Sequence, residues 1–462
     1  MKKTFALILF VAFCASAQGA AEDISAVEDT SIVNIEQKNL LLSVVSWPFV
    51  NIIQPSVEFL IYPAIPPLLY MSRENLVEKG ENLVTFGEKR QIMFYPTANA
   101  KVGSQASLGF AYWHSNVFLE DDRIHISPNL FVNADWSISV RYRKNKILGG
   151  PFYWGAGASY RADGDNWYRD MHGVRHSYSD SSIYTNSFSG FNFTGNWSLE
   201  LDVALNFYRF DLPNLYEEPI TDEVAFNRGY YRNYEAYPLT FSLLHNSLDV
   251  PYAATRGRKF SVSYSYVPVS RYNGTSDHNY HVVASRLVNY NLLGNRSYAM
   301  TVAESNANRE RLKNLTFAEA IEMFNPINVR EEVLDRRVLI TQLKMRYMVE
   351  ENEGKAPFTA MSKLGGNFPL RAYDDGFFTA PLVVGVSNEY RWPIDRYADA
   401  LIFNEYGIYG ENFGNLRLSN IKNSYGIGFR VRTPRFFVAR FSLAFHGLHG
   451  ITVILTTNPE FH

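Results

Sequence analysis

Cysteine is almost missing from this sequence of 462 residues, because Cys14 is the only one. Cys14 lies in the first twenty residues, which we expect to be removed, so the mature chain should form neither a disulfide nor a thiolate metal site. Neither charge sign is in excess, since 44 Lys and Arg face 46 Asp and Glu for a net charge of −2. This balance gives no electrostatic reason to expect nucleic acid as a partner.

Long hydrophobic runs are also absent after the first twenty residues. The most apolar stretch, 40–71, contains five prolines, which remove backbone donors and are predicted to interrupt any helix there. A membrane-spanning helix needs about 20 consecutive apolar residues, so none is expected. We assign 21–88 as a short proline-rich periplasmic segment, packed at the mouth of the following domain rather than anchored in a membrane.

The first twenty residues, 1–20, are predicted to be a signal peptide. Lys2 and Lys3 precede an apolar run from Phe5 to Phe13, and small residues follow as far as Ala20. This layout is typical of a chain that is exported from the cytoplasm. Several bonds suit cleavage, and the mature chain should begin near residues 18 to 21.

Aromatic residues are plentiful, with 30 Tyr and 33 Phe, and strict alternation is the dominant pattern from residue 89 onward. In 197–208, for example, apolar residues from Trp197 to Phe207 alternate with polar ones such as Glu200 and Asp202. A soluble antiparallel sheet with one solvated face would show the same alternation. The signal peptide, the lack of cysteine and the aromatic content favour an all-β transmembrane barrel over 89–462.

The alternating segments are about ten residues long, the length that crosses a bilayer as a tilted strand. They predict about sixteen antiparallel strands, near 89–100, 105–114, 122–133, 135–144, 152–161, 183–193, 197–210, 236–246, 257–268, 277–291, 296–305, 380–394, 399–410, 423–433, 436–446 and 449–459.

The loops are expected to differ between the two ends of the barrel, with short periplasmic turns and longer outer loops. The tight turn 194–196 falls on the periplasmic side, and the polar stretches 162–182 and 211–235 fall outside. Segment 306–379 is predicted to be a long sixth outer loop before strand twelve. Within it, 308–324 weakly favours a helix, and 338–349 suits either a helix or a hairpin arm.

Four motifs follow one another in the C-terminal third of the sequence. They are LGGNFPLRAY at 364–373, NEYRWPI at 388–394, EYG at 405–407 and SYGIGFRVRTP at 424–434. In this order they resemble the BamA/TamA outer-membrane insertase superfamily, also known as the bacterial surface antigen family. The likeness spans about residues 90–462, and the chain is similar to a short member, since 21–88 is too short and too proline-broken to hold a periplasmic POTRA module.

This resemblance implies a structural latch in which the sixth loop folds into the lumen. In the family, an arginine at the loop tip is held by acidic residues of the two strands that follow. The matching residues here are Gly365, Gly366, Arg371, Tyr373, Glu389 and Glu405. Ala372 and Glu405 stand where the family has glycine and aspartate, so the tip geometry and the pairing are expected to differ. A solvated arginine in an outer loop is the alternative for Arg371.

No enzymatic motif is present: there is no G-x-S-x-G elbow, no H-E-x-x-H, no phosphate loop and no dinucleotide fingerprint. We therefore expect no catalytic residue, no cofactor and no metal site. The resemblance implies an integral outer-membrane protein that acts in assembly or translocation of protein or lipid. Its expected partners are outer-membrane lipid and lipopolysaccharide, and unfolded or exported proteins as clients. The alternative is a pore, adhesin or structural barrel without insertase activity, and a barrel-embedded hydrolase ranks third.

Overall fold

The structure, a computed structural model, describes most of residues 52–457, all of them in one compact unit, Ile52–His462. The predicted signal peptide lies outside the described residues. The described ranges are 52–74, 76–87, 91–101, 106–132, 135–169, 175–194, 196–211, 233–249, 254–271, 278–293, 337–351, 356–366, 369–394, 397–432, 437–447 and 450–457.

Three short helices precede the sheet within the described residues, and the prolines were expected to interrupt any helix here. They are α3 (Gln54–Ile61), α4 (Ile65–Arg73) and α5 (Leu76–Val84), with the 3-10 turn η2 (Tyr62–Ala64) after α3. Pro55, Pro66 and Pro67 lie in the first turns of α3 and α4, where the backbone N–H has no partner within the helix. The prolines therefore divide the helices instead of preventing them. Within the described part of the chain, no helix is both long and apolar enough to cross a membrane.

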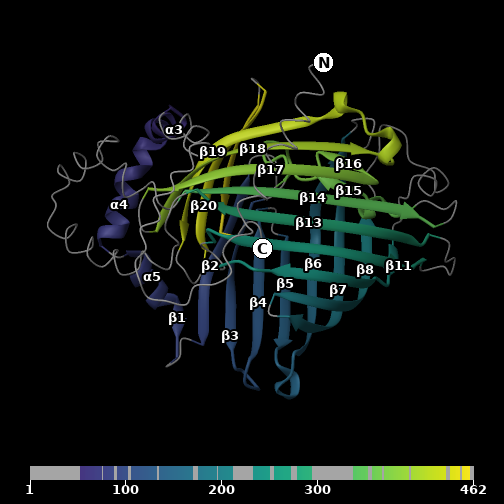
Figure 1. The fold of residues 1–462 in the computed structure, drawn as a ribbon. Coiled ribbons are helices and arrows are strands. Elements are labelled where there is room, and N and C mark those ends of the chain that lie inside the picture. The colour runs from purple at the N-terminus through teal and green to yellow at the C-terminus, as the bar shows by residue number, and fades with distance from the viewer. Residues whose placement is uncertain are drawn as a thin grey trace. The chain divides into compact units, whose positions relative to one another are not determined.

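Sixteen antiparallel strands then form a closed transmembrane barrel, which confirms the expected all-β fold (Figure 1). Each strand pairs with its neighbours in the chain, and β21 returns to pair with β2. A two-residue strand, β1 (Thr85–Phe86), also pairs with β2. The barrel strands are β2 (Ile92–Lys101), β3 (Ser107–Ser115), β4 (Asp122–Phe131), β5 (Trp136–Lys144), β6 (Phe152–Arg169), β7 (Arg175–Thr194), β8 (Trp197–Asp211), β9 (Asn233–Ala236) continued by β10 (Leu239–Asn246), β11 (Gly257–Val267) continued by β12 (Val269–Arg271), β13 (Tyr280–Leu292), β14 (Val338–Glu350), β17 (Leu382–Pro393), β18 (Ala398–Gly410), β19 (Lys422–Arg432), β20 (Phe437–His446) and β21 (Gly450–Thr456).

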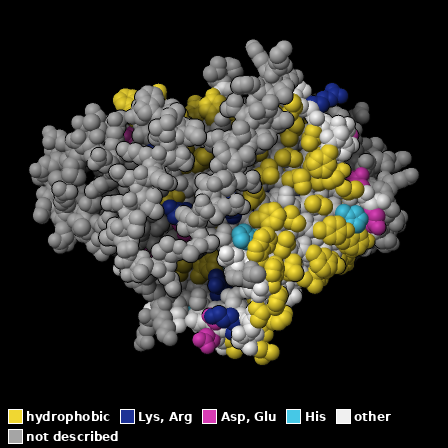
Figure 2. Space-filling view, in the orientation of Figure 1, with side chains coloured by type: hydrophobic (Ala, Val, Ile, Leu, Met, Phe, Trp, Pro, Cys, Tyr) yellow, Lys and Arg dark blue, Asp and Glu magenta, His cyan; other side chains and the backbone are white. Residues whose placement is uncertain are grey.

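Side chains alternate between the lumen and the outside of the barrel, as the period of a strand requires. In β8, Leu199 and Val203 point outward and are 53% and 52% exposed. Glu200, on the opposite face, accepts a hydrogen bond of 3.0 Å from the buried hydroxyl of Tyr153. Figure 2 shows hydrophobic side chains gathered over a broad area of the surface. An apolar outer wall of this kind suits contact with lipid.

The eleventh strand lies further along the chain than the sequence predicted. The predicted strand 296–305 lies outside the described residues, whereas β14 pairs with β13 over thirteen residues and with β17 over ten. Segment 338–349 is therefore a barrel strand, and the loop predicted over 306–379 is wrong in extent, because the connection from β14 to β17 covers only 351–381. Charged residues such as Lys344 and Arg346 obscured this strand in the sequence, although they face the lumen.

The polar stretch 162–182 is also not the loop that was predicted. β6 and β7 continue as a paired hairpin as far as Arg169 and Arg175, with a shift in register between Arg161 and Gly164. Polar strands can pair without an apolar face when water surrounds them, so alternation of hydrophobicity stops before the strand does. The other polar stretch predicted to be an outer loop was 211–235, and its residues 212–232 lie outside the described residues.

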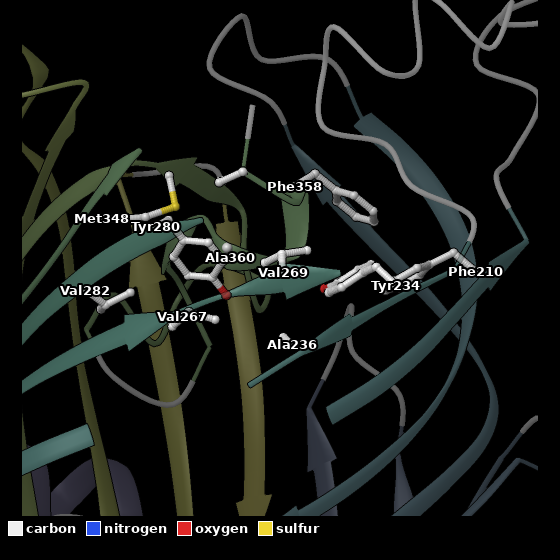
Figure 3. Close-up of a cluster of buried hydrophobic side chains, with 11 residues drawn as sticks. Phe210, Tyr234, Ala236, Val267, Val269, Tyr280, Val282, Met348, Phe358 and Ala360 are labelled. Carbon is white, nitrogen blue, oxygen red and sulfur yellow. The ribbon is translucent and has the colours of Figure 1, made fainter. Parts of the chain in front are cut away.

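The connection between β14 and β17, here called the lumen loop (351–381), packs against the inner face of the sheet. It contains the turn η6 (Phe358–Ala360) and a small hairpin of β15 (Ser362–Leu364) with β16 (Phe378–Ala380). Phe358 packs edge-on against Phe210, with 5.3 Å between ring centroids. Figure 3 shows this contact within a buried cluster formed by the inner faces of β8, β9, β11, β12, β13 and β14 and by residues of the loop. The loop is therefore anchored to one side of the lumen by aromatic packing.

Candidate functional site: a buried charge cluster under the lumen loop

Arg371, near the tip of the lumen loop, contacts both carboxylates with which the sequence paired it. Its Nε donates to Glu405 Oε1 at 2.7 Å, and its Nη1 donates to Glu389 Oε2 at 3.0 Å. Its backbone N–H also donates to Glu405 Oε2 at 2.6 Å. The guanidinium carbon lies 3.7 Å from the centre of the Phe403 ring, a cation–π arrangement. The side-chain donors belong to one planar group, so the tip is held in one orientation.

Glu389 is shared by three arginines. Besides Arg371, it accepts hydrogen bonds from Arg391 and from Arg440, with 2.7 Å between Arg440 Nη2 and Glu389 Oε2. The side chains of these four residues are between 1% and 5% exposed. We call Arg371, Glu389, Arg391, Glu405 and Arg440 the charge cluster. Ions this deeply buried require partners, because an unpaired charge there is strongly destabilising.

A second buried ionic group lies near the start of β18, around Asp399. Asp399 accepts hydrogen bonds from Arg430 and Arg432 of β19, at 2.8 Å and 2.9 Å to its Oδ2. Together with the charge cluster this gives five arginines and three carboxylates on the inner face of β17 to β20 and the loop tip. The inner wall on this side of the barrel is therefore cationic.

The turn that delivers Arg371 depends on backbone conformations that favour glycine. Gly365 and Gly366 have φ angles of +103° and +92°. A Cβ on Gly365 would lie 2.1 Å from the carbonyl oxygen of Asp374, so no side chain fits there. Leu370, directly before Arg371, also has a positive φ of +73° and is fully buried. Ala372, where a different tip geometry was expected, is not in the left-handed region.

Small residues on β17 and β18 let the loop approach the wall. A Cβ on Gly385 would lie 2.1 Å from Pro369, and one on Gly407 would lie 2.9 Å from Leu370. Both glycines face inward beside the carboxylates of the charge cluster. Close contact of the loop backbone with these strands is what excludes water from around Arg371.

The loop tip also reaches the last three strands. The Ala372 N–H donates to Ser424 of β19 at 3.1 Å, and the Ala372 carbonyl accepts from Thr452 of β21 at 2.8 Å. Tyr373 packs against His446 of β20, with 4.6 Å between ring centroids, and burial raises the pKa of its phenol. The tip therefore connects five consecutive strands, β17 to β21, with one another.

All six residues of the predicted latch lie in or beside this site. Gly366 donates a backbone hydrogen bond to the carbonyl of Tyr373 at 3.0 Å, which closes the loop. The sequence reasoning missed Phe403, Arg391 and Arg440. Alternation places all three on the lumen face, but which carboxylate they meet depends on strand register, which a single sequence does not give.

The contacts of the site support the position of the lumen loop. Its hydrogen bonds join arginines, carboxylates and hydroxyls that are already matched to one another. In the described part of the chain, no group of three or more His, Cys, Asp or Glu side chains is placed to hold a metal ion.

No protein-family model matches this sequence, and no curated protein matches it. Among solved structures, BamA from Haemophilus ducreyi lacking POTRA domains 1–3 is similar, with 14% identity and a TM-score of 0.53 over 79% of this chain and 69% of that chain. CdiB from Acinetobacter baumannii matches with 11% identity and a TM-score of 0.48 over 79% of this chain and 58% of that chain. CdiB from Escherichia coli matches with 8% identity and a TM-score of 0.47 over 79% and 62%. The fold of this chain is therefore that of the BamA barrel, with α3 to α5 in place of any POTRA module among the described residues before it.

Proposed function

We propose that this chain is an integral outer-membrane protein that inserts or translocates protein or lipid at that membrane. The observation that carries the proposal is the junction where the barrel closes. Between described residues, β2 and β21 share three residue pairs, from Asn99–Thr456 to Lys101–Ile454. The Thr457 N–H also donates to the Ala98 carbonyl at 3.0 Å. This junction, here called the seam, joins the first and last strands of the barrel, and it is the place where we propose that the wall opens.

The position of the lumen loop supports opening at the seam over conduction through the middle. The loop contacts the inner wall at two places, at Phe210 through Phe358 and at Glu389 through Arg371. Residues in the lumen obstruct a simple pore, whereas a seam gives a substrate access to the membrane. We propose that Arg371, Tyr373, Gly365, Gly366, Glu389 and Glu405 act as a structural latch, which keeps β17 to β21 together while β2 moves.

The partners proposed for this function are outer-membrane lipid and lipopolysaccharide around the barrel, and unfolded or exported proteins as clients. A seam strand offers unpaired backbone groups when it opens, and an extended client chain can pair with them as an added strand.

Disulfide locking tests the proposal. Ala100 and Leu455 lie directly opposite each other across the seam, and Leu443 and Val453 lie opposite each other between β20 and β21. In a Cys14→Ser background, the pair Ala100→Cys with Leu455→Cys should abolish function under oxidation and regain it on reduction. The control pair, Leu443→Cys with Val453→Cys, should stay active in both states. Function is measured as the amount of other barrel proteins and of lipopolysaccharide in the outer membrane after depletion of the wild-type chain.

The second candidate, a pore, adhesin or structural barrel, makes the opposite prediction. If the oxidised seam variant supports normal outer-membrane content, opening at the seam is not the function. Steady solute conductance of the purified barrel in planar bilayers, with outer-membrane assembly unaffected by depletion, would then favour the pore.

A further inference from the structure

The helices before the barrel have apolar residues on two opposite faces. On one face Val57, Ile61 and Ile65 are buried, at 8% exposure or less. On the other, Phe59 and Leu60 are 81% and 64% exposed. Two apolar faces on one short segment indicate contact with two apolar environments. The protein itself buries only the first face and leaves the second exposed.

α3 contacts the outside of the barrel wall through Glu58. Glu58 of α3 accepts a hydrogen bond of 2.9 Å from Trp392 Nε1. Trp392 points outward from β17, because the neighbouring Arg391 belongs to the charge cluster in the lumen. Outward positions elsewhere are open, such as Phe241 at 54% exposure, but Trp392 and the adjacent outward residue Ala400 are 0% exposed. α3 therefore contacts a covered part of the wall that would otherwise face lipid, and Figure 1 shows the helices beside the ends of β17 to β19.

The covered part of the wall is at the end of the barrel opposite the lumen loop. β17 begins at Leu382, where the lumen loop ends, and Trp392 is its penultimate residue. Because the first helix contacts the lipid-facing wall at this level, its outer face continues the apolar surface of the barrel.

Charge is almost absent from this segment. Between Ile52 and Met71 the only charged residue is Glu58, and its carboxylate is directed to Trp392. Phe59, Leu60 and Tyr62 are thus exposed without any neighbouring charged group in the segment. A face of this composition has affinity for the acyl-chain boundary of a membrane in proportion to the apolar area that it buries there.

We propose that α3, η2 and the start of α4 lie in the periplasmic leaflet of the outer membrane, with Phe59, Leu60 and Tyr62 in contact with phospholipid. The segment is a membrane-embedded collar on the outside of β17 and β18, and not a plug or a cap at the barrel mouth as the sequence suggested. The proposal rests on the membrane-spanning barrel and is independent of insertase activity.

Spin labelling tests it in the full chain, in vesicles of phosphatidylethanolamine and phosphatidylglycerol. A nitroxide is attached to Phe59→Cys in a Cys14→Ser background, and its collisions with oxygen and with a water-soluble nickel chelate are compared. Leu199→Cys, on the lipid-facing wall, is the control for lipid. Glu120→Cys, in the exposed turn between β3 and β4 at the same end of the barrel, is the control for water.

The expected result is an oxygen-to-nickel collision ratio at position 59 that resembles position 199 and exceeds position 120 several-fold. A ratio equal to that of position 120 would place the helix in water and overturn the proposal. Low collision rates with both reagents would mean that protein covers the face, from this chain or a second copy, and would also overturn it. A Leu60→Cys label checks that the result does not depend on the loss of Phe59, and heat-modifiable mobility on gels verifies that each variant is folded.

Discussion

The lumen loop is attached to two parts of the barrel wall by two different kinds of contact. At Arg371 the attachment is ionic, with two carboxylates and further arginines almost completely removed from water. At Phe358 it is mainly aromatic, with Phe210 and its neighbours, and hydrogen bonds of the same turn join Thr359 to Tyr234 and the Ala360 carbonyl to Arg346. Ionic contacts fix direction, whereas apolar packing tolerates changes of shape. The two attachments should therefore respond very differently to conservative substitutions.

The largest effect is expected from Glu389→Gln, which keeps the shape of the side chain and removes its charge. Arg371, Arg391 and Arg440 would lose their shared carboxylate, and breaking a buried ionic group in this way costs about 3–5 kcal/mol. Urea unfolding of the purified barrel in detergent, followed by heat-modifiable mobility, measures the loss. Glu120→Gln, at an exposed turn, is the control. Equal midpoints for the two variants would contradict the ionic account of this attachment.

Arg371→Lys should have the next largest effect. Lysine retains the positive charge. It has no planar group that could donate to Glu389 and Glu405 and at the same time lie over the ring of Phe403. We expect a loss of about 2 kcal/mol in the same unfolding experiment, since charge-assisted hydrogen bonds are each worth about 1.5–3 kcal/mol. If lysine restores full stability, simple charge neutralisation is sufficient and the planar geometry is unimportant.

Phe358→Leu should have a smaller effect, because it replaces one apolar side chain by another in a packed cluster. A loss of less than about 1.5 kcal/mol is expected. Combined with Arg371→Lys, its effect should add within about 0.5 kcal/mol, as for sites without shared partners. Strong coupling between the two would show that the loop behaves as one rigid body instead of two separate attachments.

The smallest effect is expected from Thr452→Val, which removes the hydroxyl that donates to Ala372 and leaves the volume nearly unchanged. A loss of about 1 kcal/mol is expected for one hydrogen bond. This contact joins the loop tip to the seam strand β21. The crosslink between Ala100→Cys and Leu455→Cys should therefore also form at a different rate in this variant. An unchanged crosslinking rate would show that the contact at the loop tip does not affect the seam.

Alternation predicted most of the barrel, because a strand that separates lipid from water must place apolar and polar residues on opposite faces. It failed where that condition does not hold. Lys344 and Arg346 made β14 ambiguous in sequence, and Leu401 and Phe403 put apolar side chains on the same strand face as Glu405. The structure shows that Leu401 and Phe403 face inward and are buried against the loop tip at Ala372.

The helices and the details of the charge cluster were beyond prediction for different reasons. The prolines of 52–73 indicated a break in helical structure, and only the position of each proline within a turn distinguishes a helix start from an interruption. Alternation places Arg440 on the lumen side. It reaches Glu389 of β17 from β20, however, and β18 and β19 lie between these two strands. Such contacts depend on the stagger of several strands together.

The sharing of Glu389 among three guanidinium groups also constrains how this protein can change in evolution. A substitution at any one of the four positions alters the charge balance around the other three, so single changes there should be rare among homologues. We expect Arg371, Glu389, Arg391 and Arg440 to vary together or not at all, whereas the aromatic residues around Phe358 should exchange with other large apolar residues independently.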